Sequence, residues 1–219
     1  MLHKSSFEFL KNLAQNNQKE WMDAHRKEYE TAKEDFKIVV SAIINGLQEM
    51  GMDTTALTAS NCIFRLNRDI RFAADKSPYK TNFGAAFSPH GRKAQEPGYY
   101  LHVEPGKSFV GGGMWMPDAT QLKKIRQEID YNFEDFQKII LDKKFKQFFH
   151  QIEGPKLIRA PKNYAEDHPA LEYLKLKSYA VGVALTDAQL CKKDAVEKVL
   201  EVFRTMKPFI DFLNTALDE

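Results

Sequence analysis

The spacing of apolar residues changes twice along the 219-residue chain, and this order is the strongest constraint on its fold. Residues 5–50 repeat apolar side chains at steps of three and four, as amphipathic helices do. Residues 61–116 contain short β-like runs separated by turns rich in Pro and Gly. Residues 117–219 return to helical spacing and include one more strand. This order predicts an α+β fold in which a single antiparallel sheet packs against N- and C-terminal helices.

Length and composition favour a single domain that spans residues 1–219. A chain in which 43% of residues are hydrophobic can build a sizeable core at this length. No apolar run approaches the roughly 18 residues of a membrane span, and the first residues lead into a helix pattern rather than a signal peptide. The two cysteines, Cys62 and Cys191, lie far apart in the sequence, which suits a reducing compartment. We therefore expect a cytoplasmic protein that does not associate with membranes.

The N-terminal part is predicted to form two helices. The patterns S-x-x-E at 5–8 and N-x-x-E at 17–20 are typical of capping boxes. The first helix is expected to end near Gln15, and the second to continue as one long packing helix to Gly51. His25 lies on the apolar stripe of the second helix, so we expect it to pack rather than to catalyse.

Five short segments are predicted to be strands, because they alternate in polarity and are bounded by turn residues. They are Cys62–Leu66, Asn82–Ser88, Tyr99–Val103, a segment from Ser108 to Val110 or slightly beyond, and Ser178–Leu185. The glycines 111–113 are interpreted as ending a strand, in preference to a close approach to a ligand.

The C-terminal part is predicted to be mainly helical. Asp118, Asn132 and Asp142 each precede a run with helical spacing. Pro169 can occupy the first turn of a brief helix. Pro208 falls within the apolar stripe of the last helical region, which we expect it to kink or split.

Positive charge is concentrated in a polar segment between two of the predicted strands. Five cations and two anions between Arg65 and Lys80 give this segment a formal charge of +3, although the whole chain carries only +2. The segment is too long for a tight turn, so we expect an ordered excursion from the sheet, and such loops commonly carry function. Arginine presents a planar fork of donors that suits phosphate and carboxylate oxygens. The spacing therefore predicts an anion site.

The same segment carries a resemblance to a known family. The pattern R-x-x-R-D-x-R-F at 65–72, followed by D-K-x-x-Y at 75–79, resembles the signature of the domain of unknown function 2461 family. The runs at 98–100, 111–117 and 167–169 are also similar to that family, so the resemblance covers nearly the whole chain. It implies a fold-level unit and indicates that function lies at the motif, but it implies no activity, substrate or cofactor.

Two interpretations of the charged segment remain open. Asp69 and Asp75 could neutralise arginines in a purely structural ion-pair network. However, two carboxylates cannot pair with five cations, so solvent, a carboxylate elsewhere such as Glu104, or a ligand must compensate the remainder. In an extended segment, Arg68 is expected on the core side together with Phe72, and Arg71 on the outer side.

Two histidines are further candidates for a ligand site. His168 lies in an Asp-His-Pro run, where it could act as an acid or base or could simply cap a helix. His102 is expected to share a strand face with Tyr100 and Glu104, where the three could line a cleft or face solvent. The predicted ligand-binding residues are Arg65, Arg68, Asp69, Arg71, Asp75, Lys76, Tyr79, Lys80, His102 and His168.

The leading functional hypothesis is a protein that binds a small anionic ligand, carrying phosphate or carboxylate, with enzymatic turnover left open. The alternatives are a nucleic-acid-associated protein, which is the less favoured partner class, and a structural network without a ligand. The six histidines show no i, i+3 or i, i+4 pair, and no nucleotide-binding glycine pattern or Gly-x-Ser-x-Gly elbow occurs. We therefore expect no metal and no cofactor.

Overall fold

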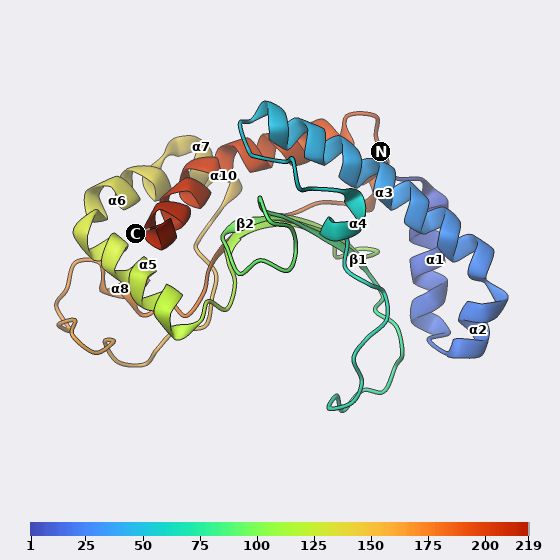
Figure 1. The fold of residues 1–219 in the computed structure, drawn as a ribbon, viewed down its shortest axis with the longest axis horizontal. Helices are drawn as coiled ribbons and strands as arrows, with labels where there is room; N and C mark the ends of the chain where they lie inside the picture. Colours follow the sequence, from blue (N-terminus) through green and yellow to red (C-terminus); the bar gives the residue numbers. More distant parts are fainter. Residues whose placement is uncertain (219) are drawn as a thin grey trace. The chain divides into compact units, whose positions relative to one another are not determined.

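The structure, a computed structural model, describes residues 1–218 and confirms the α+β architecture. These residues contain one antiparallel sheet of four strands in the order β1-β2-β3-β4, with helices at both ends of the chain (Figure 1). The strands are β1 (Phe83–Phe87), β2 (Gly98–Val103), β3 (Phe109–Met114) and β4 (Tyr179–Ala184).

The described chain divides into two compact units. The first contains residues 1–94, 100–110 and 184–201, and the second contains residues 95–99, 111–183 and 202–218. The strands β2, β3 and β4 and the last helix contribute residues to both units. No helix within residues 1–218 combines the length and the apolar character that crossing a membrane requires.

The helices of the first unit differ from the prediction at their N-termini. They are α1 (Lys4–Gln15), α2 (Lys19–Ala24), α3 (Arg26–Glu49), α4 (Ala59–Cys62) and α9 (Asp187–Leu190). Neither predicted capping box forms. The N-cap residues of α1 and α2 are His3 and Gln18, and neither side chain accepts a hydrogen bond from the first turn of its helix. The expected long helix is interrupted at His25, whose ring stacks on Trp21 at 4.1 Å between centroids. His25 therefore packs, as predicted.

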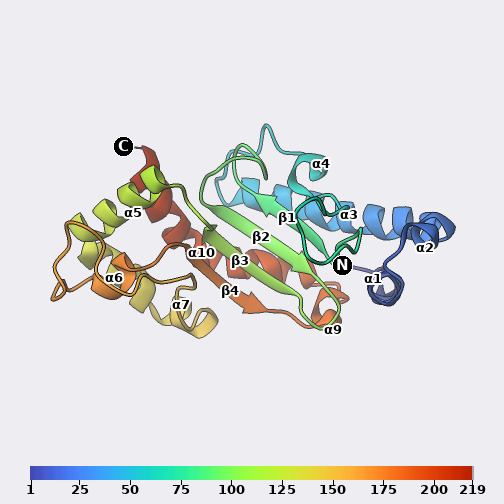
Figure 2. The same ribbon diagram turned by 90° about the horizontal axis from the view of Figure 1, so that it is seen from below.

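One face of the first unit's sheet is covered by α3. Phe36 of α3 stacks on Phe83 of β1 with 5.3 Å between the ring centroids. Along β2, Leu101 and Val103 are buried, whereas His102 between them is only half-buried. Figure 2 shows β1 and β2 from the side opposite α3, where no helix of this unit lies over them. The fold therefore leaves the second face of these strands available for polar residues.

The segment that precedes β1 is not the regular strand that we predicted for 62–66. Cys62 ends α4, and its neighbour Ile63 forms a single bridge with Ala85. Thr58 caps α4 through a capping box with Asn61, so the chain is still helical where β-like residues begin. Local capping therefore outweighs the strand propensity of this segment.

The second unit is built on helices packed around aromatic side chains. Its helices are α5 (Ala119–Tyr131), α6 (Phe133–Leu141), α7 (Lys143–Phe148), α8 (Leu171–Leu174) and most of α10 (Ala195–Asp218). Phe136 is fully buried and contacts Tyr173 and Phe212 with centroid distances of 5.1 and 5.2 Å. Pro208 was expected to kink or split the last helix, and the split is wrong, because α10 continues through this residue. The aromatic packing of this helix offsets the free-energy cost of the backbone hydrogen bond that proline cannot donate.

The glycine run also differs from the prediction, since Gly111–Gly113 lie inside β3 rather than at its end. A methyl group on Gly112 would collide with the sulfur of Met206, and Gly113 has a φ of +125°. The same addition at Gly113 would collide with the carbonyl of Tyr179 in β4. These glycines therefore serve close packing within the second unit, which agrees with a structural interpretation.

Candidate functional site

The charged segment forms an ordered arm that extends from the sheet on the side away from α3 (Figure 1). Two antiparallel segments form its base, where Lys80 N–H donates to the Leu66 carbonyl at 2.8 Å and Arg68 N–H donates to the Pro78 carbonyl at 2.9 Å. The side chain of Asn17 donates to and accepts from the backbone of Tyr79, at 2.9 and 3.1 Å. Backbone contacts therefore fix the base of the arm, as expected of an ordered excursion.

Two ion pairs are internal to the arm. Arg71 donates two hydrogen bonds to Asp69, at 2.9 and 2.7 Å, and Arg68 pairs with Asp75. Asp75 also accepts from the hydroxyl and N–H of Ser77 at 2.6 and 2.9 Å. The bonds from Ser77, followed by that from Arg68, hold the pKa of Asp75 well below its usual range, and Arg71 lowers the pKa of Asp69. Four of the ten predicted site residues thus neutralise one another in pairs.

The tip of the arm contradicts one packing prediction. Phe72 is 95% exposed, so it does not share a core face with Arg68. The guanidinium of Arg71 lies 5.9 Å from its ring centroid, and the ammonium of Lys76 donates to the Ile70 carbonyl at 3.0 Å. The backbone turns at these residues instead of remaining extended, and the alternation of faces is therefore lost.

Three cations of the motif segment, Arg65, Lys76 and Lys80, have no carboxylate partner among the described residues. Arg65 is exposed, and Lys80 is half-buried with its ammonium 5.4 Å from the ring centroid of Phe64. Burial lowers the pKa of Lys80, and the charge of Arg65 lowers it further. The two ion pairs of the arm cancel, so its formal charge of +3 resides on Arg65, Lys76 and Lys80.

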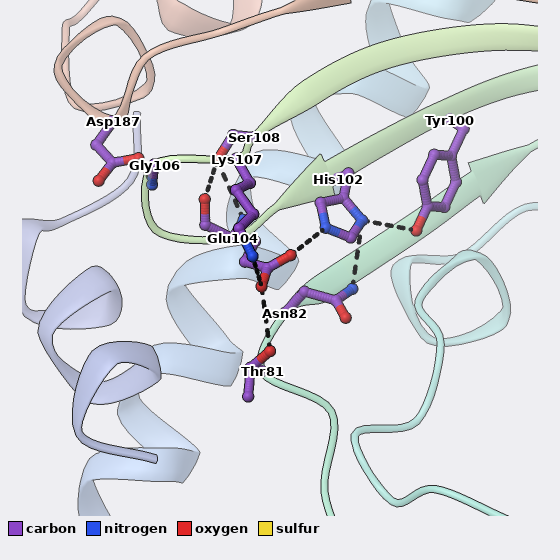
Figure 3. Close-up of polar contacts among 9 residues, drawn as sticks. All are labelled: Thr81, Asn82, Tyr100, His102, Glu104, Gly106, Lys107, Ser108 and Asp187. Carbon is purple, nitrogen blue, oxygen red and sulfur yellow. Dashed lines mark hydrogen bonds and ion pairs between the residues drawn. The ribbon is translucent and has the colours of Figure 1, made fainter. Parts of the chain in front are cut away.

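A chain of polar contacts crosses the uncovered face of β2, as Figure 3 shows. The hydroxyl of Tyr100 lies 3.2 Å from Nδ1 of His102, and Nε2 of His102 lies 3.1 Å from a carboxylate oxygen of Glu104. The prediction that these three residues share a strand face is confirmed. Glu104 also accepts from the Thr81 hydroxyl at 3.2 Å and lies 3.7 Å from the Lys107 ammonium, so it does not compensate the arginines.

Aromatic rings enclose this polar chain. Phe109 stacks on His102 with 4.8 Å between centroids, and Phe64 meets Tyr100 edge-on at 6.2 Å. Phe64 is also the ring beneath Lys80, which connects the unpaired cation to the same face of the sheet. A cavity of about 620 Å³ borders the cluster, because Lys107 and Phe109 line it together with residues 184–188.

Gly84 is a site residue that sequence reasoning missed. A methyl group at this position of β1 would lie 2.6 Å from the Tyr100 hydroxyl oxygen. The absence of a side chain therefore lets the phenol lie flat over β1 and reach His102. A glycine inside a predicted strand indicates close packing in general, but the tyrosine that it contacts could not be identified from the sequence.

His168 belongs to the second unit and has mainly structural contacts there. Its Nδ1 accepts from the N–H of Ala170 at 3.1 Å, so its Nε2 carries the proton and donates to Asp130 at 2.8 Å. The contact with Ala170, the N-cap residue of α8, is structural, but no side chain caps the first turn of α8, so the helix-capping interpretation is not confirmed. The charged arm and His102 lie in the other unit.

One comparison with known proteins assigns the chain to a family. The model of the family described as "Conserved hypothetical protein (DUF2461)" matches residues 5–212. The chain belongs to this family. No curated protein and no solved structure matches it. Within the described residues, no three His, Cys, Asp or Glu side chains are grouped so that they could hold a metal ion.

Proposed function

We propose that this member of the family binds a small anionic ligand, carrying phosphate or carboxylate, beside Lys80 on the uncovered face of β1 and β2. The observation that carries the proposal is the pair of neighbouring cations Arg65 and Lys80, which no carboxylate of the described residues neutralises. The other two arginines of the motif are already engaged by carboxylates of the arm. The proposed site therefore includes two of the ten predicted residues as direct ligands.

The electrostatics of Lys80 support an anion at this position. Removing an ammonium from water without a counter-charge costs free energy, and the lowered pKa of Lys80 reflects that cost. An anion beside Lys80 and Arg65 would offset both the burial and their mutual repulsion. Arg65 would add the forked donors that suit phosphate or carboxylate oxygens.

The surrounding rings support an organic ligand rather than a bare ion. Phe64 presents its ring next to Lys80, and Tyr100 and Phe109 continue the ring surface from Phe64. Such surface stabilises an apolar or planar group attached to the anion. We therefore propose a phosphorylated or carboxylated metabolite as the ligand class.

A thermal-shift screen tests the proposal. A ligand that binds only the folded state increases the free energy of unfolding, by about 2.7 kcal/mol when its concentration is one hundred times its dissociation constant. The melting temperature rises accordingly. We expect phosphate, nucleotides or dicarboxylates to give such a shift, and we expect Lys80→Met and Arg65→Ala each to reduce it at least several-fold. Lys11→Met is the matched control, because Lys11 is an exposed cation of α1 in the same unit.

The variants also give the outcome that rejects this site. If Lys80→Met and Arg65→Ala keep the full shift, the anion binds elsewhere. If no small anion shifts the melting curve of the original chain, the proposal fails.

Single-stranded nucleic acid is a second candidate, favoured by Phe72. An exposed aromatic ring beside an arginine is the combination on which bases stack, and the arm supplies positive charge for the backbone. An oligonucleotide should then bind with a steep dependence on salt, and Phe72→Ala should weaken it. Binding of a metabolite at Lys80 should depend less on salt, and Phe72→Ala should leave its affinity unchanged.

A further inference from the structure

We infer that the Tyr100 hydroxyl is a proton-transfer group, activated by His102 and Glu104, that acts on the anionic ligand. The three side chains form a continuous series from phenol to imidazole to carboxylate on the uncovered face of β2 (Figure 3). The inference deepens the proposed function, since it assigns a reaction class, namely proton abstraction from an anionic substrate, to the same site.

The contacts determine which nitrogen of His102 carries the proton. The Glu104 carboxylate accepts a hydrogen bond from the Thr81 hydroxyl and lies near the Lys107 ammonium, so it is a hydrogen-bond acceptor. Nε2 of His102 must then be the protonated nitrogen, which leaves the lone pair on Nδ1. The Tyr100 hydroxyl donates to that lone pair, with the Asn82 amide more distant at 3.5 Å. An acidic side chain that fixes the histidine tautomer is the arrangement that activates hydroxyl groups in catalytic triads.

The proposed step conserves protons and changes no oxidation state. The phenolic proton of Tyr100 moves to Nδ1 of His102, and the resulting imidazolium lies between the phenolate and the Glu104 carboxylate. The phenolate oxygen then takes a proton from the bound substrate, so that the net transfer is from substrate to His102. Tyr100 is the catalytic residue in this step, whereas His102 and Glu104 position and activate it.

The charges around His102 are compatible with this direction of transfer. On its own strand the ionisable neighbours are Tyr100 and Glu104, and the following turn contributes Lys107. From the segment before β1, the neighbours Thr81 and Asn82 are neutral. The Lys80 ammonium lies over the ring of Phe64, which meets Tyr100 edge-on, and its positive charge would favour a phenolate.

A purely structural role predicts the opposite reactivity for Tyr100. Burial raises the pKa of Tyr100, and a passive phenol with a raised pKa reacts more slowly than an exposed one. A phenol that transfers its proton to His102 reacts faster in spite of burial. The two roles are therefore distinguishable without knowledge of the substrate.

Labelling with benzenesulfonyl fluoride tests the inference on the intact protein. The phenol oxygen bonds to sulfur, fluoride leaves, and the phenolic proton passes to His102. Peptide mass spectrometry measures the rate at Tyr100 and at Tyr131, which is 73% exposed and serves as the internal reference. We expect Tyr100 to be labelled at least ten-fold faster near pH 7. Labelling no faster than at Tyr131 would overturn the inference.

The pH profile separates activation from simple accessibility. Labelling of a phenol in water, with a pKa of about 10, should rise roughly ten-fold per pH unit between about pH 7 and pH 9. Labelling of Tyr100 should rise much less, because the base is the Nδ1 lone pair of His102 rather than hydroxide from the solvent. His102→Phe and Glu104→Gln should each slow the labelling of Tyr100, and His102→Phe should restore the steep profile.

Matched measurements keep each outcome decisive. Melting curves of the variants verify folding, and Glu104→Gln keeps the shape of the side chain if His102→Phe fails to fold. An unchanged rate in a folded Glu104→Gln variant contradicts the role of the carboxylate. Because the labelling uses no anionic ligand, it can succeed where the anion screen fails, and the two proposals are tested separately.

Discussion

At the scale of single residues, the arginines of the motif differ in what they contact rather than in charge. The Arg68 side chain is 28% exposed and pairs with Asp75, which is itself fixed by Ser77. The Arg71 side chain is 76% exposed, and its partner Asp69 is only two residues away. Arg68 therefore connects the two sides of the arm, whereas Arg71 closes a local contact at its tip.

We expect Arg68→Ala to destabilise the fold more than Arg71→Ala. The first change removes the less exposed of the two arginines and leaves Asp75 without its cross-arm partner, and it should lower the melting temperature by about 2–4 °C. The second removes a solvent-exposed pair, which contributes little to stability. Thermal unfolding measures both, with Arg26→Ala as the control because Arg26 forms an exposed ion pair in α3. Equal losses in the two arm variants would refute the distinction.

The pH dependence of anion binding should report on Lys80. Its pKa is lower in the folded chain, so the unfolded chain holds the proton more tightly, and stability rises as pH increases through the folded pKa of Lys80. A bound anion favours the ammonium and reverses this trend. We expect the melting shift given by phosphate to be constant near neutral pH and to fall as Lys80 deprotonates below its ordinary pKa. In Lys80→Met, the phosphate-induced melting shift should no longer fall with pH. If it still falls in that variant, the group that titrates is not Lys80.

At the scale of elements, local patterns predicted three of the strands and the helix starts at Asp118, Asn132 and Asp142, but not the two N-terminal capping boxes. The predicted strands 82–88, 99–103 and 178–185 differ from β1, β2 and β4 by no more than one residue at each end. Alternation of polarity and flanking turn residues are properties of the segment itself. The box at 17–20 failed because the Asn17 side chain binds Tyr79 in the arm. The box at 5–8 failed because α1 already begins after His3, whose N–H binds Asp35 of α3.

The candidate site was only partly predictable for a related reason. The shared face of Tyr100, His102 and Glu104 follows from the two-residue period of a strand and was foreseen. The pairing of Arg71 with Asp69, and the exposure of Phe72, depend on how the backbone turns within the arm. Likewise, the role of Gly84 requires knowledge of which strand lies beside β2. Long-range contacts of this kind leave no local signal in one sequence.

At the scale of the whole molecule, the question is whether the two compact units unfold together. Three strands and α10 have residues in both units, so melting one unit interrupts hydrogen-bonded elements of the other. We therefore propose that residues 1–219 behave as a single cooperative domain. In calorimetry, this requires equal calorimetric and van't Hoff enthalpies.

A core variant of the second unit tests this cooperativity directly. Phe136→Ala removes a fully buried ring and should cost about 3–5 kcal/mol, or roughly 10 °C in melting temperature. The chain has two tryptophans, Trp21 in the first unit and Trp115 in the second, so Trp115→Phe and Trp21→Phe backgrounds report on each unit in turn. We expect Phe136→Ala to lower the fluorescence transition equally in both backgrounds, because a cooperative domain distributes the loss. A shift confined to the Trp115 signal would show that the units unfold independently and that the chain comprises two domains.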